Sequence, residues 1–276
     1  MSTLTATRPA APAAQERSTS GLGRTIASEW LKLRSVRSTY MYLAAVALGV
    51  ALGGLIAYLM TADFDTSPPS EQAFFGSADP GQLAVPLAQF CLAALAALAM
   101  TSEYATGMIR TSLTAVPARG RMLAAKAVVV AAVTAVAGLA VNFASYFIGA
   151  AITGDRPAPI RAFESLGDAM PSILAGSAAL VVMGLLGLGL GAVLRATAGA
   201  LVSITAILFV APIAAQFLPR ELGVKVFATL PMSLPAQLAG TEASPVYTQW
   251  GAAGVLALYA VVSLAAGWYL LKRRDA

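Results

Sequence analysis

The sequence predicts an all-α membrane protein: six transmembrane helices, an N-terminal interfacial helix before the first, and a re-entrant or outer helical segment before the last. One observation behind this is composition, with 58% hydrophobic and 11% charged residues and a mean hydropathy of +0.75. The other is six long stretches almost free of charge. A helix needs about 20 apolar residues to cross a hydrocarbon layer about 30 Å thick, and each stretch is that long. The predicted spans are residues 40–60, 82–100, 122–152, 170–194, 198–218 and 248–271.

The spans are predicted to be helices rather than strands of a barrel. Barrel strands alternate apolar and polar residues over about ten positions, and Ala124–Val141 shows no alternation. Small residues recur in every span, and the fourth carries four glycines between Gly184 and Gly191, which favours close helix packing. The single cysteine, Cys91, excludes an internal disulfide and a cysteine metal cluster.

Basic and acidic residues outside the spans are divided unequally between the two sides of the membrane. Alternate segments of a multi-pass chain share one face of the membrane, so the two termini, the loop after the second span and the link at Arg195 belong together. These segments hold 14 of the 18 basic residues, whereas the other three loops hold nine of the 13 acidic ones. Because basic segments stay in the cytoplasm, we expect both termini to be cytoplasmic. The basic side is expected to contact anionic lipid, not nucleic acid.

The N-terminal region predicts two parts. Residues 1–22 lack an apolar core followed by a cleavage site, and we expect a disordered cytoplasmic tail rather than a signal peptide. Residues 23–38 place Ile26, Trp30 and Leu33 at helical spacing, which predicts an amphipathic helix at the headgroup boundary. A positively charged flank without regular structure is the alternative. The charges of this segment include Lys32, Arg34 and Arg37.

The loop at 101–121 is the longest predicted cytoplasmic loop and the richest in polar residues. Gly107 permits a break, and Pro117 with Gly120 ends any helix before the third span. A short amphipathic helix here would present three side chains to a partner and leave Arg110 free. The three are Tyr104, Met108 and Ile109. An ordinary loop whose arginines only follow the charge rule is the alternative.

The sequence lacks several residue types and motifs, and each absence argues against a class of function. The chain has no histidine, which excludes the usual Ser–His, His-ligated metal and haem sites. No ionisable residue lies near the middle of a span, which disfavours ion-coupled transport. There is no GxxxxGK(S/T) phosphate loop either. We therefore expect no catalytic residue, metal or cofactor in this chain, and any motor must be another subunit.

The candidate polar residues inside the spans are uncharged. Each could bond a neighbouring helix or line a substrate path. The candidates are Gln89, Asn142, Ser145, Tyr146 and Gln216. The loop at 219–247 is partly apolar and is interrupted by Pro231 and Pro235, which predicts a re-entrant or surface-lying helical pair packed over the outer ends of the bundle.

The order of these parts resembles the permeases of type 2 ABC transporters from actinobacteria, over about residues 24–272. The specific parts are SEWLKLRSVRSTY at 28–40 and SEYATGMIRTSLTAVPARGRMLAAK at 102–126, followed by an LP-containing outer segment before the last span. The resemblance implies an exporter subunit in a bacterial plasma membrane. It would pair with a second permease copy, identical or related, and with two ATP-binding subunits that hold ATP and Mg²⁺.

By this resemblance, residues 23–38 look like the connecting helix and Glu103–Leu113 like the coupling helix that docks on the ATPase. The expected docking residues are Glu103, Tyr104, Met108, Ile109 and Arg110. The apolar spans suit an amphipathic or hydrophobic cargo. A non-transporting scaffold or immunity protein is the alternative. An intramembrane lipid-modifying enzyme is less favoured, because Asp63, Asp65 and Asp79 are scattered without a metal-ligand pattern.

Overall fold

The structure, a computed structural model, describes residues 21–115, 119–242 and 245–273, except for the side chains of Arg110, Leu113 and Ala115. The first 20 residues of the expected tail lie outside the described residues. Within the described part the chain is helical and has no strand. Its elements are α1 (Leu22–Ser35), α2 (Arg37–Thr66), α3 (Pro69–Gln72), α4 (Gly81–Ala105), α5 (Met108–Ala115), α6 (Arg119–Thr153), α7 (Leu166–Leu194), α8 (Thr197–Thr205), η1 (Ala206–Val210), α9 (Ala211–Ala215), α10 (Arg220–Thr229), α11 (Leu234–Ala239) and α12 (Gln249–Arg273).

Six helices are long and apolar enough to cross a membrane: α2, α4, α6, α7, the continuous stretch α8–η1–α9, and α12. They contain most of each predicted span, and the predicted fold class is confirmed. Several extend beyond the apolar core, because a helix bonds its own backbone whatever its side chains are. α2, for example, continues to Thr66, past the expected end at residue 60.

α7 is the central helix of the bundle. It packs against α4, α6, α11 and α12. Of its most apolar window 67% is buried, against 22% for α12, which lies at an edge of the bundle. α2 packs on α4 and α6 at another edge.

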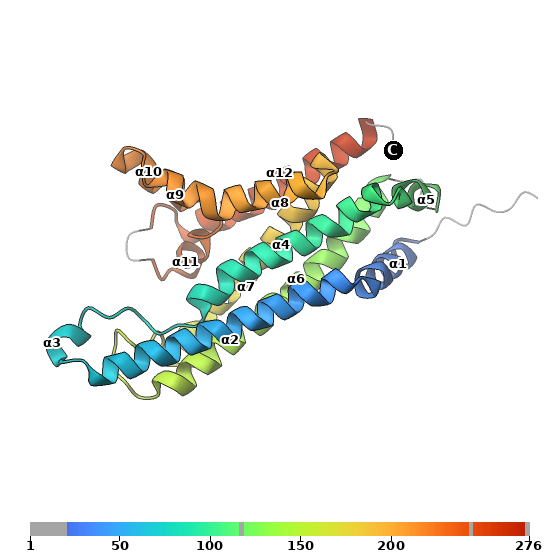
Figure 1. Ribbon diagram of the computed structural model, residues 1–276. Helices are drawn as coiled ribbons and strands as arrows, with labels where there is room; N and C mark the ends of the chain where they lie inside the picture. The colour runs from blue at the N-terminus through green and yellow to red at the C-terminus, as the bar shows by residue number, and fades with distance from the viewer. Residues whose placement is uncertain (1–20, 116–118, 243–244, 274–276) are drawn as a thin grey trace, which may run out of the picture.

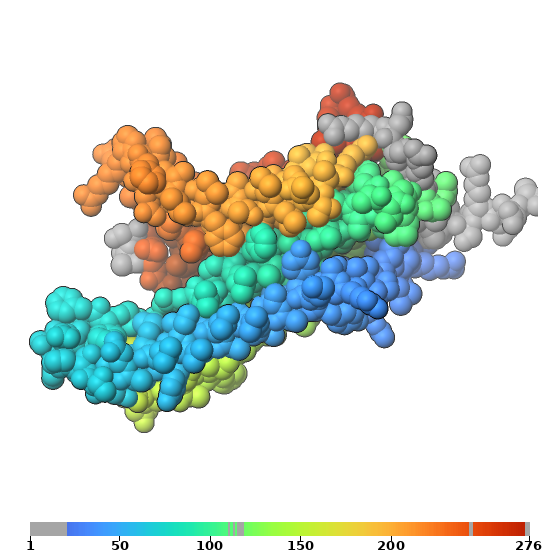
Figure 2. Space-filling model, in the orientation of Figure 1, coloured from blue at the N-terminus to red at the C-terminus, as the bar shows by residue number. Residues whose placement is uncertain are grey.

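The bundle has two chemically different ends. α1, α5 and the end of α12 lie at one end, called here the α1/α5 end, while α3, α10 and α11 lie at the other, the α3/α10 end (Figure 1). This is the distribution that alternating segments predict. Figure 2 shows the surface dividing at the α3/α10 end into two arms, α2 with α3 in one and α9 with α10 in the other.

Close packing in the core depends on small residues, as predicted from the glycines of the fourth span. At Gly187 in α7, an added Cβ would overlap the carbonyl oxygen of Ala93 in α4. The obstacle is backbone, which no rotamer change can move. The two helices therefore approach each other backbone to backbone, and this prediction is confirmed.

The fifth span is interrupted by the wider helical turn η1 (Ala206–Val210). Pro212 follows at the start of α9. Its ring crowds the carbonyl four residues earlier, at Leu208, and it has no N–H to donate. The wider turn accommodates this defect without ending the helix.

The segment between the fifth and sixth spans forms the predicted helical pair, α10 and α11. α11 packs against α7 and α12, and Pro231 lies in the turn between α10 and α11. The carbonyl of Pro231 accepts a hydrogen bond from Gln89 Nε2 of α4 at 3.3 Å. Buried Gln237 donates to Ala228 O at 2.9 Å. The first bond holds the turn against the bundle, and the second joins α11 to α10.

Candidate functional site

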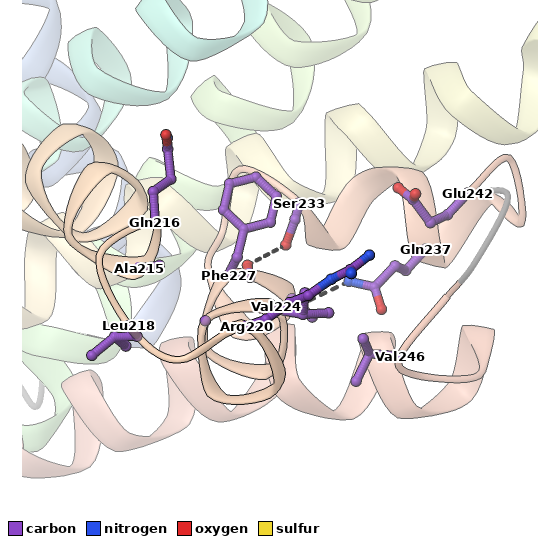
Figure 3. A pocket seen from close by; sticks show the side chains of 12 residues that line it. Ala215, Gln216, Leu218, Arg220, Val224, Phe227, Ser233, Gln237, Glu242 and Val246 are labelled. Atoms are coloured by element: carbon purple, nitrogen blue, oxygen red, sulfur yellow. Dashed lines mark hydrogen bonds between the residues drawn. The ribbon is translucent and has the colours of Figure 1, made fainter.

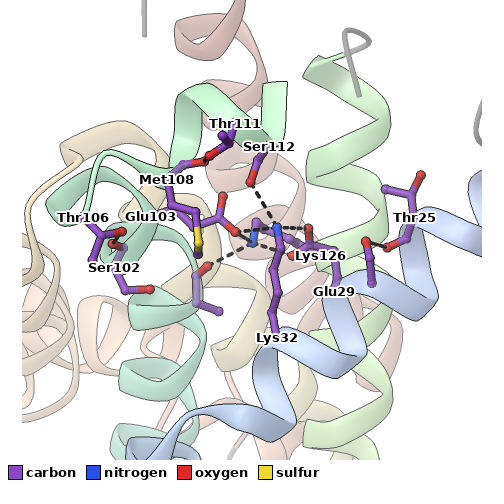
Figure 4. Close-up of polar contacts among 12 residues, drawn as sticks. Thr25, Glu29, Lys32, Ser102, Glu103, Thr106, Met108, Thr111, Ser112 and Lys126 are labelled. Atoms are coloured by element: carbon purple, nitrogen blue, oxygen red, sulfur yellow. Dashed lines mark hydrogen bonds and ion pairs between the residues drawn. The ribbon is translucent and has the colours of Figure 1, made fainter. Parts of the chain in front are cut away.

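Four charged side chains meet at the α1/α5 end and form what we call the charge cluster: Glu29 and Lys32 of α1, Glu103 of α4 and Lys126 of α6. They come from three helices and from positions up to 97 residues apart. Figure 4 shows the two ammonium groups between the two carboxylates. Two acids and two bases make the cluster neutral overall.

Lys126 occupies the centre of the charge cluster and is only 3% exposed. Its ammonium group donates to Glu29 Oε2 at 2.5 Å, to Glu103 Oε1 at 2.7 Å and to the carbonyl of Ala99 at 3.1 Å. A lysine ammonium has three N–H donors, so every donor has a partner. This complete pairing is what permits a charge to be buried four residues inside a predicted span.

Lys32 extends the charge cluster to α5. Its ammonium group donates to Glu29 Oε1 at 2.8 Å, to Glu103 Oε1 at 2.9 Å and to Ser112 Oγ at 3.1 Å. Burial alone lowers the pKa of Lys32. The hydrogen bonds and charges of the two carboxylates outweigh burial and raise this pKa above its ordinary value. Lys32 therefore stays charged at physiological pH.

Glu103 leaves one acceptor unused. Its side chain is 2% exposed, and Oε2 has no hydrogen-bond partner within the described part of the chain. A cavity of about 100 Å³ adjoins the charge cluster, lined by all four of its members and by Met108. This volume has room for a few water molecules, which would satisfy the free oxygen.

The charge cluster fixes the relative positions of helices more than it stabilises the fold. A buried ion pair replaced as a whole by apolar side chains often costs nothing, because desolvation offsets the attraction between the charges. Removing a single partner costs about 3–5 kcal/mol, because a charge is left buried without a counterion. α1, α4 and α6 are therefore expected to move together at this end rather than slide past one another.

The expected coupling helix Glu103–Leu113 is divided in two. Gly107 adopts φ +71°, the left-handed conformation that ends a helix, so α4 runs to Ala105 and α5 begins at Met108. Glu103 consequently lies in the last turn of α4 and points into the charge cluster. Tyr104 is also on α4, and its ring lies 4.9 Å from the Arg195 guanidinium carbon. Within this chain the Glu103 side chain is 2% exposed, and its docking role stays a prediction.

The remaining docking candidates differ in exposure. Ile109 is 4% exposed and packs with Met100 and Met122, so it anchors α5 to the bundle instead of facing a partner. Met108 is 44% exposed. The side chain of Arg110 lies outside the described residues. Thr111, which we did not single out, is exposed on α5.

α1 is the expected connecting helix, and Val36 in an extended conformation separates it from α2. Its apolar face differs from the predicted one. Leu33 is buried with Leu95 and Val129, and Ile26 packs on the same group, whereas Trp30 is 46% exposed. The three residues therefore do not share one lipid-facing side. Of the four residues expected on the connecting helix, Lys32 joins the charge cluster. The other three, Trp30, Arg34 and Arg37, are exposed.

Glu29, Ser112 and Lys126 belong to the site but were not identified as site residues from the sequence. A signal was present: Glu29 and Glu103 are acidic residues on the side that otherwise collects basic ones. Lys126 is a charge within a predicted span. An acid and a base that both violate the prevailing pattern are candidates for a pair, although the sequence does not say which charges meet.

The polar residues predicted inside the spans divide between two cavities at the α3/α10 end. Gln89, Asn142, Ser145 and Tyr146 line one cavity of about 490 Å³. Gln216 lines another of about 480 Å³ between α9, α10 and α11 (Figure 3). Asn142 also donates to Ser177 Oγ at 3.4 Å, which is the interhelical bond we considered as its other role. Whether these residues contact a substrate stays a prediction.

Among the described residues, no group of three or more His, Cys, Asp or Glu side chains lies close enough together to hold a metal ion. No curated protein matches the chain. A family described as ABC-2 family transporter protein matches residues 25–219, which include most of α1, the charge cluster, α5 and five of the six apolar spans. The chain therefore belongs to the ABC-2 transporter family and is a multi-pass membrane permease.

Proposed function

We propose that the chain is the permease subunit of an ATP-driven exporter that moves an amphipathic or hydrophobic substrate by alternating access. Two separate ATP-binding subunits would hold ATP and Mg²⁺, and a second permease copy, identical or related, would complete the transporter. The observation that carries this proposal is the charge cluster, which joins α1 to two spans directly beside the exposed face of α5.

The docking surface in this proposal is the exposed face formed by Thr106, Gly107, Met108 and Thr111. Ile109 holds the opposite side of α5 in the core of the bundle. A partner that displaces α5 would therefore pull on the bundle through Ile109 and on α1 through Ser112 and Lys32. In alternating access the permease has two conformations, one open to each side of the membrane. They would differ in their affinity for the ATP-bound partner, and that difference couples ATP binding to transport.

In this proposal the α1/α5 end faces the cytoplasm of a bacterium. Eleven described basic residues lie on the segments of this end, in α1, at the start of α2, in α5, in the first turns of α6, at the α7–α8 link and at the end of α12. Basic residues near the ends of spans favour the cytoplasmic side. An ATP-binding partner must also be on that side, where its nucleotide is.

The test is co-purification with an ATPase encoded by a neighbouring reading frame that contains GxxxxGK(S/T). Thr111→Arg places a long cation on the proposed docking face, and Thr66→Arg is its matched control. Both threonines are exposed: Thr66 is the last residue of α2, and Thr111 lies in α5. The hydroxyl of each donates a hydrogen bond to the carbonyl three residues earlier, at 2.9 Å for Thr111 and 3.0 Å for Thr66. We expect Thr111→Arg to lose most of the ATPase and Thr66→Arg to retain it.

Equal ATPase recovery with Thr111→Arg and the unmodified chain would contradict docking at α5. A chain that remains without an ATPase in mild detergent, and that does not stimulate ATP hydrolysis in vesicles, would favour a membrane scaffold instead. Both variants are also compared in thermal unfolding, so that a folding defect is not taken for a docking defect.

A further inference from the structure

The cavity of about 490 Å³ lies between α4, α6, α7 and α11 of a single chain, and we call it the outer cavity. Asp79 lines it just before α4 begins, and Gln89 lies about 12 Å along α4 from its first residue, Gly81, at about 1.5 Å per residue. Its volume is within the usual range for small-molecule sites, about 300–1,000 Å³. It lies at the opposite end of the bundle from the charge cluster.

Two of its lining residues each carry a buried polar atom that has no partner within the described residues. The atoms are Gln89 Oε1 of α4 and Ser145 Oγ of α6, on side chains 1% and 3% exposed. Gln89 Nε2 donates to Pro231 O, and this bond fixes the orientation of the amide, whose oxygen is unpaired. A buried polar group without a hydrogen bond costs free energy. A ligand N–H or O–H donor that reaches either atom would satisfy it.

Asp79 is the one charged side chain that lines the outer cavity. Its Oδ1 accepts a hydrogen bond from Gly81 N–H at 2.8 Å, and it makes no ion pair within the part of the chain that the structure describes. Burial raises the pKa of its carboxyl, and the bond from Gly81 opposes that rise. A charge so placed is stabilised by a cation.

Arg161 is the basic candidate for that cation, but its ion pair is with Asp155, at 3.9 Å. Arg161 lines a cavity of about 20 Å³ that adjoins the outer cavity and shares Asp79 with it. Its guanidinium donates to the carbonyls of Phe163 at 2.9 Å and Glu164 at 2.6 Å. These bonds direct it to the backbone of its own loop.

Two aromatic rings line the same cavity as the carboxylate. Tyr146 and Phe163 line the outer cavity, with ring centroids 6.4 Å apart. Ring faces attract cations, particularly where water is partly excluded. An acid, two unpaired acceptors and an aromatic pair, on a wall that has both apolar and further uncharged polar side chains, together select for one ligand chemistry.

We propose that the outer cavity binds an amphipathic molecule carrying a protonated amine. The ammonium group contacts Asp79 beside the Tyr146 ring, and further donors of the ligand reach Gln89 Oε1 or Ser145 Oγ. The apolar body of the ligand packs against Val85, Ile173 and neighbouring apolar residues. The site belongs to one chain and goes beyond the proposed function, because it needs neither the ATPase nor the second permease copy.

The test uses the full-length chain in lipid nanodiscs and dansylcadaverine, a fluorescent naphthalene that carries a primary amine. Its N-acetyl derivative, which has no charge, is the matched ligand control, and signal from empty nanodiscs is subtracted. We expect saturable binding of the amine and much weaker binding of the acetylated compound. Loss of a charge-assisted contact predicts that Asp79→Asn weakens binding by about tenfold or more.

Asp79→Asn is suitable because asparagine keeps an oxygen that can accept from Gly81 N–H. Asp63→Asn is the matched control: Asp63 is an exposed acid at the same end, in α2, and does not line the cavity. We expect its affinity to equal that of the unmodified chain. Should Asp79→Asn fail to fold, Ser145→Ala and Gln89→Leu test the same wall and are each expected to weaken binding severalfold.

Three results would overturn the proposal. Equal affinity for the amine and the acetylated compound would show that charge is not recognised. Equal weakening by Asp63→Asn and Asp79→Asn would indicate attraction to the acidic surface alone. The absence of saturable binding would indicate that the cavity holds water. Co-purification with the ATPase is measured on separate samples, so the docking proposal and the outer-cavity proposal fail independently.

Discussion

Lys32 of α1 and Ser112 of α5 are joined by a hydrogen bond of 3.1 Å between Nζ and Oγ, although they are 80 positions apart in the chain. The same ammonium group pairs with Glu29 and Glu103. One side chain therefore connects α5, the proposed docking helix, to α1 and to the end of α4. If the partner moves α5, this contact is a direct route by which the movement reaches the charge cluster.

Ser112→Ala is expected to weaken coupling without weakening the fold. Lys32 is 33% exposed, so water can replace the lost hydroxyl. The net change in stability should be about 1 kcal/mol or less. Stimulation of the partner's ATP hydrolysis should fall severalfold, measured on complexes in vesicles. Ser112→Thr keeps the hydroxyl and should retain most of the stimulation. Equal stimulation by Ser112→Ala and the unmodified complex would remove Ser112 from the coupling route.

Lys126→Met is expected to be strongly destabilising. It leaves the Glu29 and Glu103 carboxylates buried together with only Lys32 as counterion, and the loss of one buried partner costs about 3–5 kcal/mol. The expected observation is a large fall in the thermal midpoint of the purified protein. Arg156→Met, which breaks an exposed ion pair with Asp65 at the α3/α10 end, is the control and should lower the midpoint much less.

Combining Lys126→Met with Glu103→Gln tests whether the charges act as one unit. The double variant removes one cation and one anion, so Glu29 and Lys32 remain as a balanced pair. We expect the double variant to lose less stability than the two single variants lose together, by at least about 0.5 kcal/mol, because residues in one network couple by that much or more. Strict additivity would show that Lys126 and Glu103 contribute independently.

The six spans were predictable because the bilayer imposes their length and polarity on each segment separately. Their ends were less predictable, as α2 and α4 show. α4 continues to Ala105 through polar residues that are not suited to lipid but still complete a helix. Gly107 then ends it, and that break was anticipated. What it did to Glu103 was not: the residue was placed on the docking helix, whereas it completes the preceding span.

The charge cluster was not predictable because it is a tertiary feature. Glu29 and Lys126 are 97 positions apart, and no local pattern pairs them. Average hydropathy also conceals Lys126, since one charge among many apolar residues changes the mean little. The outer cavity has the same origin. Its polar residues were noticed singly in two spans, but Asp79 was set aside as an isolated acid before the fold placed it beside them.

Gly187→Ala is expected to disrupt the packing of α4 against α7. The new methyl group would overlap the carbonyl oxygen of Ala93, and overpacking of a core typically costs about 1–3 kcal/mol. Gly254→Ala is the matched control, because Gly254 is an exposed helical glycine with nothing within 4 Å of its added Cβ. Thermal unfolding should separate the two variants. Equal midpoints would indicate that α4 and α7 can move apart without cost.

Cysteine labelling tests the orientation proposed for the bundle. Cys91 is 3% exposed and is first replaced by alanine, which gives a background without thiols. Thr66→Cys and Thr111→Cys then place one thiol at each end, at exposed positions. A membrane-impermeant maleimide added to intact cells should label the Thr66→Cys variant, and the Thr111→Cys variant only after the membrane is opened. The physical reason is the excess of basic residues at the α1/α5 end, which resist translocation. The reverse labelling pattern would place α5 outside, where no ATP-binding partner could dock.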